Sequence, residues 1–429
     1  MDKTILLVGG NDDAVRKAAR LGLRVLLLQH PTKLTAEQEQ FAEEIRIVDY
    51  TEWGQVERAA KELWDSPGFS VALSLTEPGL EPAGRINDMY GLGATGYEVT
   101  RRFRDKLAMR RHLESVGAGA VPAEPLLRRQ DMDAFAAAHG YPFIVKPTDA
   151  TASIGVFRVD GPVDCDRVWG STSRLRGTRT DRVSSMYVLQ DFMMEKYVEG
   201  PEYSVESFSF AGRHVVVTLT EKFVDTGSFA EVGHAVPARV PEGVRESVRV
   251  CVTRFLDQIG LRDGVAHTEV RVGPDGPVII ESHNRIAGDA IPELVWGAYG
   301  IDLSTYAFGW PFRLVPELPD RPEPHAGACT RFIVAGPGRV ESVAGAEAAL
   351  AEPGVLDVRI TAKPGDATRP LRDNWDRLGL VAVTGADADA AIERGAEVIG
   401  GVVKIGILGD DGRQRLAHAA PVGGQEVPA

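Results

Sequence analysis

The sequence predicts a multidomain protein that combines α/β and α+β architecture, and three observations lead to this prediction. The chain has 429 residues, which is too long for one ordinary hydrophobic core. Its N-terminal part alternates apolar strand-like runs with helix-like segments, as a doubly wound sheet does. A proline-rich stretch, "PELPDRPEPHAG", then separates a strand-rich middle part from the C-terminal part.

The composition is that of an ordinary soluble globular protein, and it argues against several classes of function. The 61 acidic and 48 basic residues give a net charge of -13, which disfavours nucleic acids and membrane surfaces as partners. No segment approaches the roughly 20 apolar residues that span a bilayer, and the first strand-like run, "TILLV", is too short for a signal-peptide core. We therefore expect a cytoplasmic protein that acts on small molecules.

The three cysteines carry no signal of a metal or disulfide framework. Cys165, Cys251 and Cys329 are widely separated and make no paired metal-ligand spacing. We expect reduced structural thiols, without a disulfide or a structural zinc ion.

The N-terminal part reads as strand, glycine turn, helix and strand, which is the beginning of a parallel sheet. The run "TILLV" is followed by Gly9-Gly10, a helix-like segment and "RVLLL"; a further helix is expected around residues 55–64, and a strand at "VALSLT". A dinucleotide site is not favoured, because the full G-x-G-x-x-G pattern is absent and the second strand runs into "QH" rather than into an acid for a ribose. We expect a scaffold or substrate-side role for this part.

A helix and a small α+β unit are expected next, with strands at "FIVKPT" and "IGVFRV". Thr100 can cap a helix that places Lys106 in its middle and ends at Gly117, a glycine suited to a left-handed stop. Lys146 ends an apolar strand and precedes a small-residue loop, residues 149–155. Such a loop can lay backbone N–H groups and a hydroxyl over phosphates while the lysine supplies charge. A hairpin with an exposed lysine explains the same pattern.

Two polar interruptions stand out in the strand-rich middle part. In "LQDFMMEKYVEGPEYSVESF" a bend around Tyr197-Val198 can present one carbonyl and one N–H to the edge of an adenine, and the carboxylate of Glu202 can accept hydrogen bonds from ribose hydroxyls. In "AHTEVRVGPDGPVIIESHNRIAGD" two acids, Glu269 and Glu281, lie in apolar strand-like runs joined by a turn. Two glutamates on the solvent face of a hairpin are the alternative interpretation.

The order of these motifs, from about residue 97 to residue 310, resembles the ATP-grasp superfamily. The resemblance implies a pre-ATP-grasp domain at 1–96, a linker helix with the small subdomain at 97–198, a large subdomain with the metal site at 199–315, and a lid-like C-terminal domain at 316–429. The end of this last domain, "GRQRLAHAAPVGGQEVPA", is rich in small and polar residues, so we expect a frayed tail. It also implies ATP and two Mg²⁺ ions, with Mn²⁺ as an alternative, held by the metal ligands Glu269 and Glu281. The expected nucleotide contacts are Lys106, Lys146, Ser153, Gly155, Glu195, Tyr197, Val198 and Glu202.

One part of the metal motif departs from the family pattern. The usual Glu-x-Asn-x-Arg is replaced here by "ESHNR", so that His283 stands where asparagine is expected and Asn284 is shifted by one residue. On an extended strand this shift points Asn284 to the opposite face. Imidazole is a poor magnesium ligand. We therefore expect ATP and water to complete the coordination, and Asn284 to serve only if a bulge intervenes.

The segment "EVGHAVPA", residues 231–238, resembles the corresponding one in L-amino-acid ligases, including the bacilysin-type dipeptide ligases. By that resemblance Glu231 lies near a substrate amino group, and His234 and Arg285 hold carboxylate or acyl-phosphate oxygens. Asp289 is a further expected substrate contact. The alternative for His234 is a turn histidine packed beside proline.

These resemblances imply an ADP-forming ligase that activates a carboxylate as an acyl phosphate and couples it to an amine, most directly two L-amino acids. Its base for the amine is unassigned, and the loop at 149–155 is expected to close over the site. The segment "KPGDATRPLRDNWDRLGLVAVTG" forms either a lid or a surface hairpin. The alternatives are a tailoring ligase that joins an amino acid to a different acid or amine, and a non-catalytic nucleotide-binding regulator. A homodimer is implied by the family alone.

Overall fold

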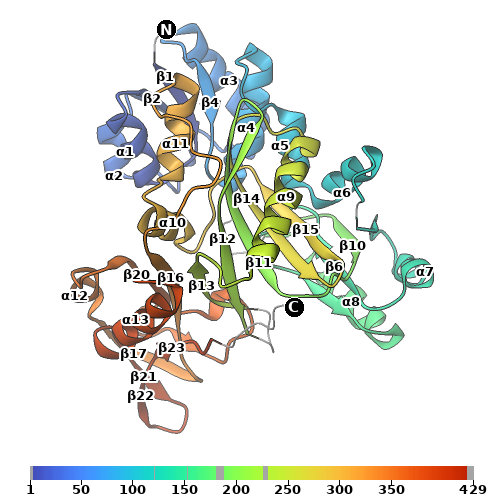
Figure 1. The fold of residues 1–429 in the computed structure, drawn as a ribbon, viewed down its shortest axis with the longest axis vertical. Helices are drawn as coiled ribbons and strands as arrows, with labels where there is room; N and C mark the ends of the chain where they lie inside the picture. Colours follow the sequence, from blue (N-terminus) through green and yellow to red (C-terminus); the bar gives the residue numbers. More distant parts are fainter. Residues whose placement is uncertain (1–2, 120, 152, 180–187, 226–229, 423–429) are drawn as a thin grey trace.

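The computed structural model describes residues 3–119, 121–151, 153–179, 188–225 and 230–422 (Figure 1). The N-terminal sheet is wholly parallel, in the order β3 (Glu44–Ile47), β2 (Arg24–Gln29), β1 (Thr4–Val8) and β4 (Val71–Leu73). Its connections are the helices α1 (Asp12–Arg20), α2 (Ala36–Phe41) and α3 (Trp53–Asp65), and α4 (Glu77–Tyr90) follows β4.

Both faces of this sheet are covered, as the continuous apolar runs predict. Alternate residues of β1 enter two different cores: Ile5 and Leu7 lie in the core that contains α1, and Leu6 and Val8 lie in the core that contains α3. The prediction of a doubly wound N-terminal unit is confirmed.

The linker helix differs from the prediction. The chain forms two helices, α5 (Tyr97–Arg104) and α6 (Lys106–Ser115), which are separated at Asp105. The side chain of Asp105 accepts hydrogen bonds from the backbone N–H groups of Leu107 and Ala108, so Asp105 is the cap of the second helix. Thr100 therefore lies inside α5, and Lys106 begins a helix rather than lying in the middle of one. Gly117 has a φ of 68°, as expected for a left-handed stop.

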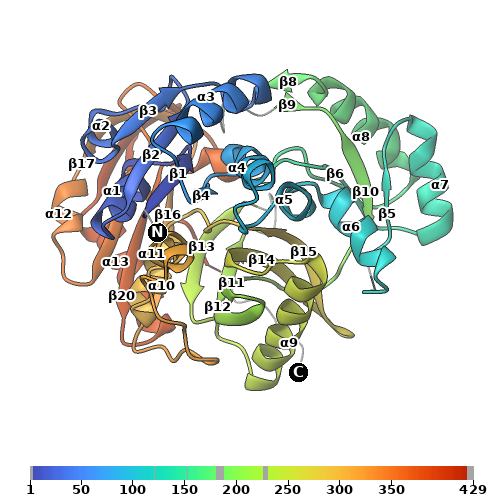
Figure 2. The same cartoon turned by 90° about the horizontal axis from the view of Figure 1, so that it is seen from above.

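The small subdomain is built on an antiparallel sheet in the order β5 (Ala123–Pro125), β10 (Phe192–Lys196), β6 (Phe143–Pro147) and β7 (Phe157–Val159). The helices α7 (Arg129–His139) and α8 (Pro162–Leu175) share a core with it. A short ribbon of β8 (Thr178–Arg179) and β9 (Val188–Leu189) adjoins α8 in sequence. Figure 2 shows this subdomain on one side of the molecule and the N-terminal sheet on the other.

A nine-stranded sheet forms the centre of the protein. Its order is β15 (Gly276–His283), β14 (Gly264–Gly273), β11 (Glu202–Phe210), β12 (Arg213–Val224), β13 (Glu231–Val236), β16 (Gly327–Val334), β20 (Gly379–Gly385) and β18 (Val355–Ile360), and β23 (His418–Ala419) also pairs with β16. The helix α9 (Glu242–Ile259), which the strand-rich interpretation of this region missed, packs on the β11–β15 part. The helices α10 (Ile291–Tyr299) and α11 (Leu303–Gly309) and the 3-10 turn η1 (Trp310–Phe312) follow β15.

The proline-rich stretch falls between η1 and β16, as predicted for a break in regular structure. The sheet itself crosses this break, because β13 pairs with β16. The C-terminal part adds a second sheet of β19 (Ala367–Thr368), β17 (Gly338–Ala344), β21 (Lys404–Gly409) and β22 (Gln414–Leu416), with α12 (Ala346–Leu350), α13 (Ala388–Gly401) and the 3-10 turn η2 (Asn374–Asp376).

The predicted frayed tail needs correction. Residues 414–416 pair with β21, and residues 418–419 pair with β16, so this segment belongs to both sheets. Ala420 is fully buried and its N–H donates to Phe332. Residues 423–429 lie outside the described residues. Among the helices that the structure describes, none is long and apolar enough to cross a membrane.

Candidate active site

One large cavity, of about 1280 Å³, connects the candidate functional residues. Its walls come from the N-terminal sheet, the small subdomain, the central sheet and the C-terminal segment around η2. Of the predicted site residues, Asn284 and Gly155 are the two that do not line it; the others do.

The acidic pair faces this cavity from the β14–β15 hairpin. Glu269 and Glu281 are direct partners across the ladder, so both side chains point to the same face. The register shifts beside this pair, which leaves Ile280 as an extra residue and bends the strand at the pair. Two carboxylates side by side offer the hard oxygen ligands that Mg²⁺ requires, and a ligand with phosphate oxygens and water can complete an octahedral set. The chemistry of these donors therefore fits a divalent cation.

Glu281 is held by Lys106 of α6 and by His283 of its own strand. The Lys106 ammonium lies 3.0 Å from its Oε2 atom, and the His283 Nε2 atom lies 3.1 Å from Oε1. Burial alone would raise the pKa of Glu281, but Lys106 and His283 outweigh it and hold the pKa well below its usual value. Lys106 also donates to the Ala150 carbonyl at 2.7 Å, which connects α6 to the small-residue loop.

The structure places the two uncertain metal-motif residues on opposite sides, as the strand alternation predicts. His283 lies beside Glu281, and its Nδ1 atom is 3.2 Å from Glu77. The Asn284 amide donates to the Thr100 hydroxyl at 3.3 Å and lines a separate small cavity. The bulge in this strand falls before Glu281, so it does not bring Asn284 to the acidic pair.

Glu77 is a buried residue of the cavity wall that the sequence analysis did not identify. It begins α4 directly after β4, is buried, and pairs with both Arg285 and His283. The attraction of Arg285 outweighs the effect of burial and holds the pKa of Glu77 well below its usual value. The N-terminal sheet thereby fixes the guanidinium of Arg285 at the cavity wall.

Lys222, on β12, is a second residue that the sequence analysis missed. Its ammonium contacts Glu202 at 2.6 Å, Glu231 at 2.9 Å and Glu269 at 2.9 Å, and its side chain is 5% exposed. Burial would lower the pKa of Lys222, but the three carboxylates raise it well above its usual value. Lys222 therefore joins three predicted site residues: the nucleotide contact Glu202, the metal ligand Glu269 and the substrate contact Glu231. A charged residue in the apolar run "VVVTLTEKFV" is the same signal that identified Glu269.

The residues that were predicted to contact the nucleotide, apart from Gly155, line one end of the cavity, and several of them form buried ion pairs. Lys146 contacts Glu195 at 2.8 Å, and Arg110 holds the other oxygen of Glu195 at 2.6 Å. Arg271 contacts Glu202 at 3.0 Å and lies over the ring of Tyr197.

The bend at Val198 and the small-residue loop also line this end of the cavity. The Val198 carbonyl accepts a hydrogen bond from Arg271 at 3.0 Å. In the loop, Ser153 and Gly155 have φ values of 57° and 68°. Ser153 is exposed and lines the cavity, so its hydroxyl is accessible to a ligand. Ala152 lies outside the described residues.

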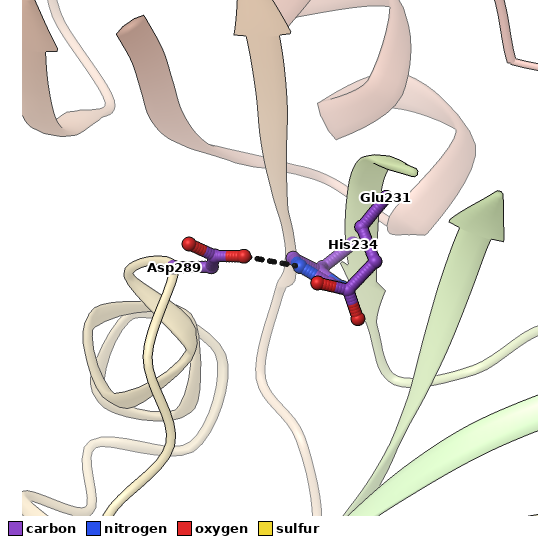
Figure 3. A group of neighbouring side chains, drawn as sticks. All are labelled: Glu231, His234 and Asp289. Carbon is purple, nitrogen blue, oxygen red and sulfur yellow. Dashed lines mark ion pairs between the residues drawn. The ribbon is translucent and has the colours of Figure 1, made fainter. Parts of the chain in front are cut away.

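Glu231, His234 and Asp289 converge at the other end of the cavity (Figure 3). Residues three apart on a regular strand point to opposite faces. In β13 the register shifts, so that Val224 pairs with Glu231 and Phe223 pairs with Gly233. The unpaired Val232 turns Glu231 to the face on which His234 lies. His234 is 1% exposed, and its Nε2 atom lies 3.5 Å from Asp289.

The segment around η2 closes this end of the cavity. Asn374 forms two hydrogen bonds with Glu231: its oxygen accepts from the Glu231 N–H at 2.8 Å, and its amide donates to the Glu231 carboxylate at 3.0 Å. Arg377 donates to both oxygens of Asp289, at 2.9 and 3.1 Å. Burial would raise the pKa of Asp289, but Arg377 and then His234 lower it. Of the two interpretations of this segment, the wall of a site is thus favoured over a surface hairpin.

Comparisons with known proteins agree with these motifs. Residues 139–293 match the ATP-grasp domain family, and residues 331–403 match L-amino acid ligase C-terminal domain 2. A relative from Sinorhizobium fredii, the uncharacterized protein y4rH, is 26% identical over 408 residues, which cover 93% of this chain and 83% of the relative. The alanine–anticapsin ligase of Bacillus subtilis is 22% identical over 237 residues, which cover 52% of this chain and half of that ligase.

Solved structures show the same fold. The crystal structure of L-amino acid ligase from Bacillus licheniformis has a TM-score of 0.78 at 20% identity and covers 94% of this chain and 98% of that one. The biotin carboxylase domain of Hydrogenobacter thermophilus 2-oxoglutarate carboxylase, solved with MgADP, has a TM-score of 0.69 at 14% identity. The match covers 97% of this chain and 91% of that one. The chain thus carries an ATP-grasp domain in a multidomain α/β fold and resembles the L-amino-acid ligases. The fold class and the family resemblance predicted from the sequence are confirmed.

Proposed function

We propose that this chain is an ADP-forming ligase that joins two L-amino acids through an acyl phosphate. The observation that carries the proposal is the continuity of the cavity. It leads from the buried lysines and the paired acids at one end to Arg285 in the middle and to the Glu231, His234 and Asp289 cluster at the other end. A phosphoryl donor, a carboxylate and an amine can therefore meet in one enclosed space.

The nucleotide end supports ATP as the phosphoryl donor. ATP supplies the phosphoryl group that activates the substrate carboxylate. Lys106 and Lys146 bring two ammonium groups to the cavity, and Glu269 and Glu281 would hold two Mg²⁺ ions. Lys106 contacts Glu281 and Lys146 contacts Glu195 in this structure. When ATP binds, its phosphate oxygens would replace these carboxylates as partners of the two ammonium groups. Ser153 and the backbone at Val198 are the proposed contacts to the phosphates and the adenine.

Arg285 is the proposed clamp for the activated acid. Its guanidinium is held at the cavity wall by Glu77, so little side-chain freedom is lost when a carboxylate or an acyl phosphate binds to it. Lys222 contacts the carboxylates of Glu231 and Glu269, each at 2.9 Å, and so holds the two side chains in place. Because an acyl phosphate hydrolyses on contact with water, the enclosing wall formed by η2 and the loop at 149–155 protects it.

The cluster at the far end suits the amine. Glu231 and Asp289 present carboxylate oxygens to one point, and a substrate ammonium group can donate to both. The specific match at residues 331–403 supports amino acids as the substrates, because this segment contributes Asn374 and Arg377 to the cluster.

A second candidate function is a tailoring ligase that joins an amino acid to a different acid or amine. The observation that favours it is the outer end of the cavity, where Trp296 and Trp375 are 56% and 38% exposed. Two accessible indoles provide flat apolar surface for a larger, ring-containing substrate.

A pairwise screen tests the proposal. The full-length protein is incubated with Mg²⁺, ATP and all pairs of amino acids, and phosphate release and product mass are read from the same wells. A dipeptide mass in proportion to phosphate supports the leading function. An amide product that appears only when a ring-containing acid or amine is added supports the second candidate. Phosphate release without any coupled product contradicts both.

A further inference from the structure

We propose that His234 is the general base that removes a proton from the attacking ammonium group; this inference rests on the ligase function proposed above. The argument uses the hydrogen bonding of His234, the spacing of its neighbours, and the charge on each group that faces it.

His234 is buried without a hydrogen-bond partner on either ring nitrogen, within the described residues. The distance of 3.5 Å from its Nε2 atom to Asp289 is too long for a good hydrogen bond. A buried polar group left without a partner bears the full cost of its desolvation. An imidazole at the wall of a substrate cavity recovers this cost when a ligand brings the missing partner.

The spacing of the cluster suits an ammonium group. The acceptor atoms of Glu231, His234 and Asp289 all lie within 4.8 Å of one another. The Nε2 atom of His234 lies 3.5 Å from Asp289, so the three acceptors are close enough together for one ammonium group to donate to all of them.

The two carboxylates already have partners in the protein. Lys222 contacts one oxygen of Glu231 and Asn374 donates to the other. Arg377 donates to both oxygens of Asp289. The imidazole of His234 can bind a proton without the loss of any such contact, and the Asp289 carboxylate beside it stabilises the imidazolium that forms.

The surroundings of His234 keep it in place. Lys222 and Thr330 are its ladder partners on β12 and β16, and the ring of Phe332 packs against it at 5.8 Å. The guanidinium of Arg377 also lies over the Phe332 ring, 3.8 Å from its centre.

The proposed step is as follows. The ammonium group gives one proton to Nε2 of His234 and becomes a neutral amine. The amine lone pair forms the C–N bond, and the bond between the acyl carbon and the phosphate oxygen breaks. Inorganic phosphate leaves with that electron pair and accepts the second nitrogen proton. The His234 imidazolium then returns its proton to water when the products leave.

The test compares two nucleophiles in the variant His234→Gln. Hydroxylamine is uncharged at neutral pH and needs no base, whereas the α-amino group of a free amino acid is protonated at neutral pH and needs one. We expect ADP release and hydroxamate formation within about threefold of the wild type, and amino-acid coupling reduced by about 10²–10⁴-fold. The remaining coupling should rise about tenfold per pH unit throughout the neutral range, in which the amino group is still mostly protonated. The variant His214→Gln, at a buried histidine that contacts Ser209 and Asp257 outside the cavity, is the matched control.

Equal losses with both nucleophiles, no loss, or an unchanged pH profile would overturn the assignment of His234. If His234→Gln does not fold, as judged by its thermal transition, His234→Asn is measured with the same two nucleophiles and the same criteria. A wild-type protein that forms neither ADP nor hydroxamate refutes the ligase function itself. Amino-acid coupling by the wild type combined with equal losses in the variant refutes the base alone.

Discussion

The ammonium of Lys222 offers a test of the electrostatics at the centre of the site. It is buried and lies within 2.9 Å of three carboxylates, those of Glu202, Glu231 and Glu269. The variant Lys222→Met keeps the volume and removes the charge. Because removal of one partner from a buried ion pair costs about 3–5 kcal/mol, and each kcal/mol shifts the midpoint of a domain of this size by about 2–4 °C, we expect the thermal midpoint to fall by roughly 6–20 °C.

The pKa shifts in this cluster predict how the stability difference between Lys222→Met and the wild type changes with pH. The pKa of Lys222 is raised, so its contribution is complete below its unfolded pKa near 10.4 and is lost as the pH rises through the folded pKa. The pKa values of Glu202 and Glu269 are lowered, so their contribution is present above about pH 4.3 and is lost as the pH falls through their folded pKa values. In Lys222→Met the carboxylates protonate more readily, and the difference from the wild type should therefore shrink as the pH falls from 8 to 5.

Differential scanning calorimetry at several pH values measures this difference. The variant Lys61→Met, at an exposed position of α3, should change the midpoint by less than about 2 °C. A midpoint of Lys222→Met within 2 °C of the wild type, or a difference that stays constant from pH 8 to pH 5, would refute the electrostatic role of the lysine.

Three further substitutions test other parts of the site. Glu281→Gln should lower phosphate release on the order of 10²-fold, with a higher Mg²⁺ requirement in a metal titration; full activity with normal folding would contradict the metal role. Glu77→Gln removes the charge that holds Arg285 and should lower kcat about 10–100-fold with little change in the KM for ATP; steady-state kinetics with an unchanged kcat would count against it. Asn374→Ala leaves Glu231 with an unpaired oxygen and should raise the KM for the amine about tenfold, and an equal effect on the KM for ATP would contradict a local role.

The positions of several strands were predictable from the sequence, because apolar runs and glycine turns identify them, but the order of the strands in the central sheet was not predicted. The order of the chain through the N-terminal sheet, the small subdomain and the hairpin follows from these local signals. The break between α5 and α6 was not predicted, because Asp105 caps the second helix within a continuous helical pattern. The C-terminal pairing of β23 with β16 depends on contacts between residues far apart in sequence, which no local pattern reports.

The candidate site was predictable where a motif of fixed spacing carries it. Glu269 and Glu281 were identified because charged residues interrupt apolar strands. Glu77 and Arg377 were missed because each reaches the site from a distant part of the chain: Glu77 from the end of the N-terminal sheet, and Arg377 from the segment after η2. The bulge at Val232, which brings Glu231 and His234 to one face, has no sequence signal of its own.

The ladder between β13 and β16 has a consequence for exchange of parts between related ligases. Because Gly233 to Val236 pair with Ala328 to Arg331, the C-terminal domain takes its orientation from the strand that carries Glu231 and His234. A chimera that replaces residues 316–429 must form this ladder again, because otherwise Asn374 and Arg377 do not reach Glu231 and Asp289. Replacement of residues 361–377 alone leaves the ladder intact, so this short segment is the natural unit for altering which molecules the pocket admits.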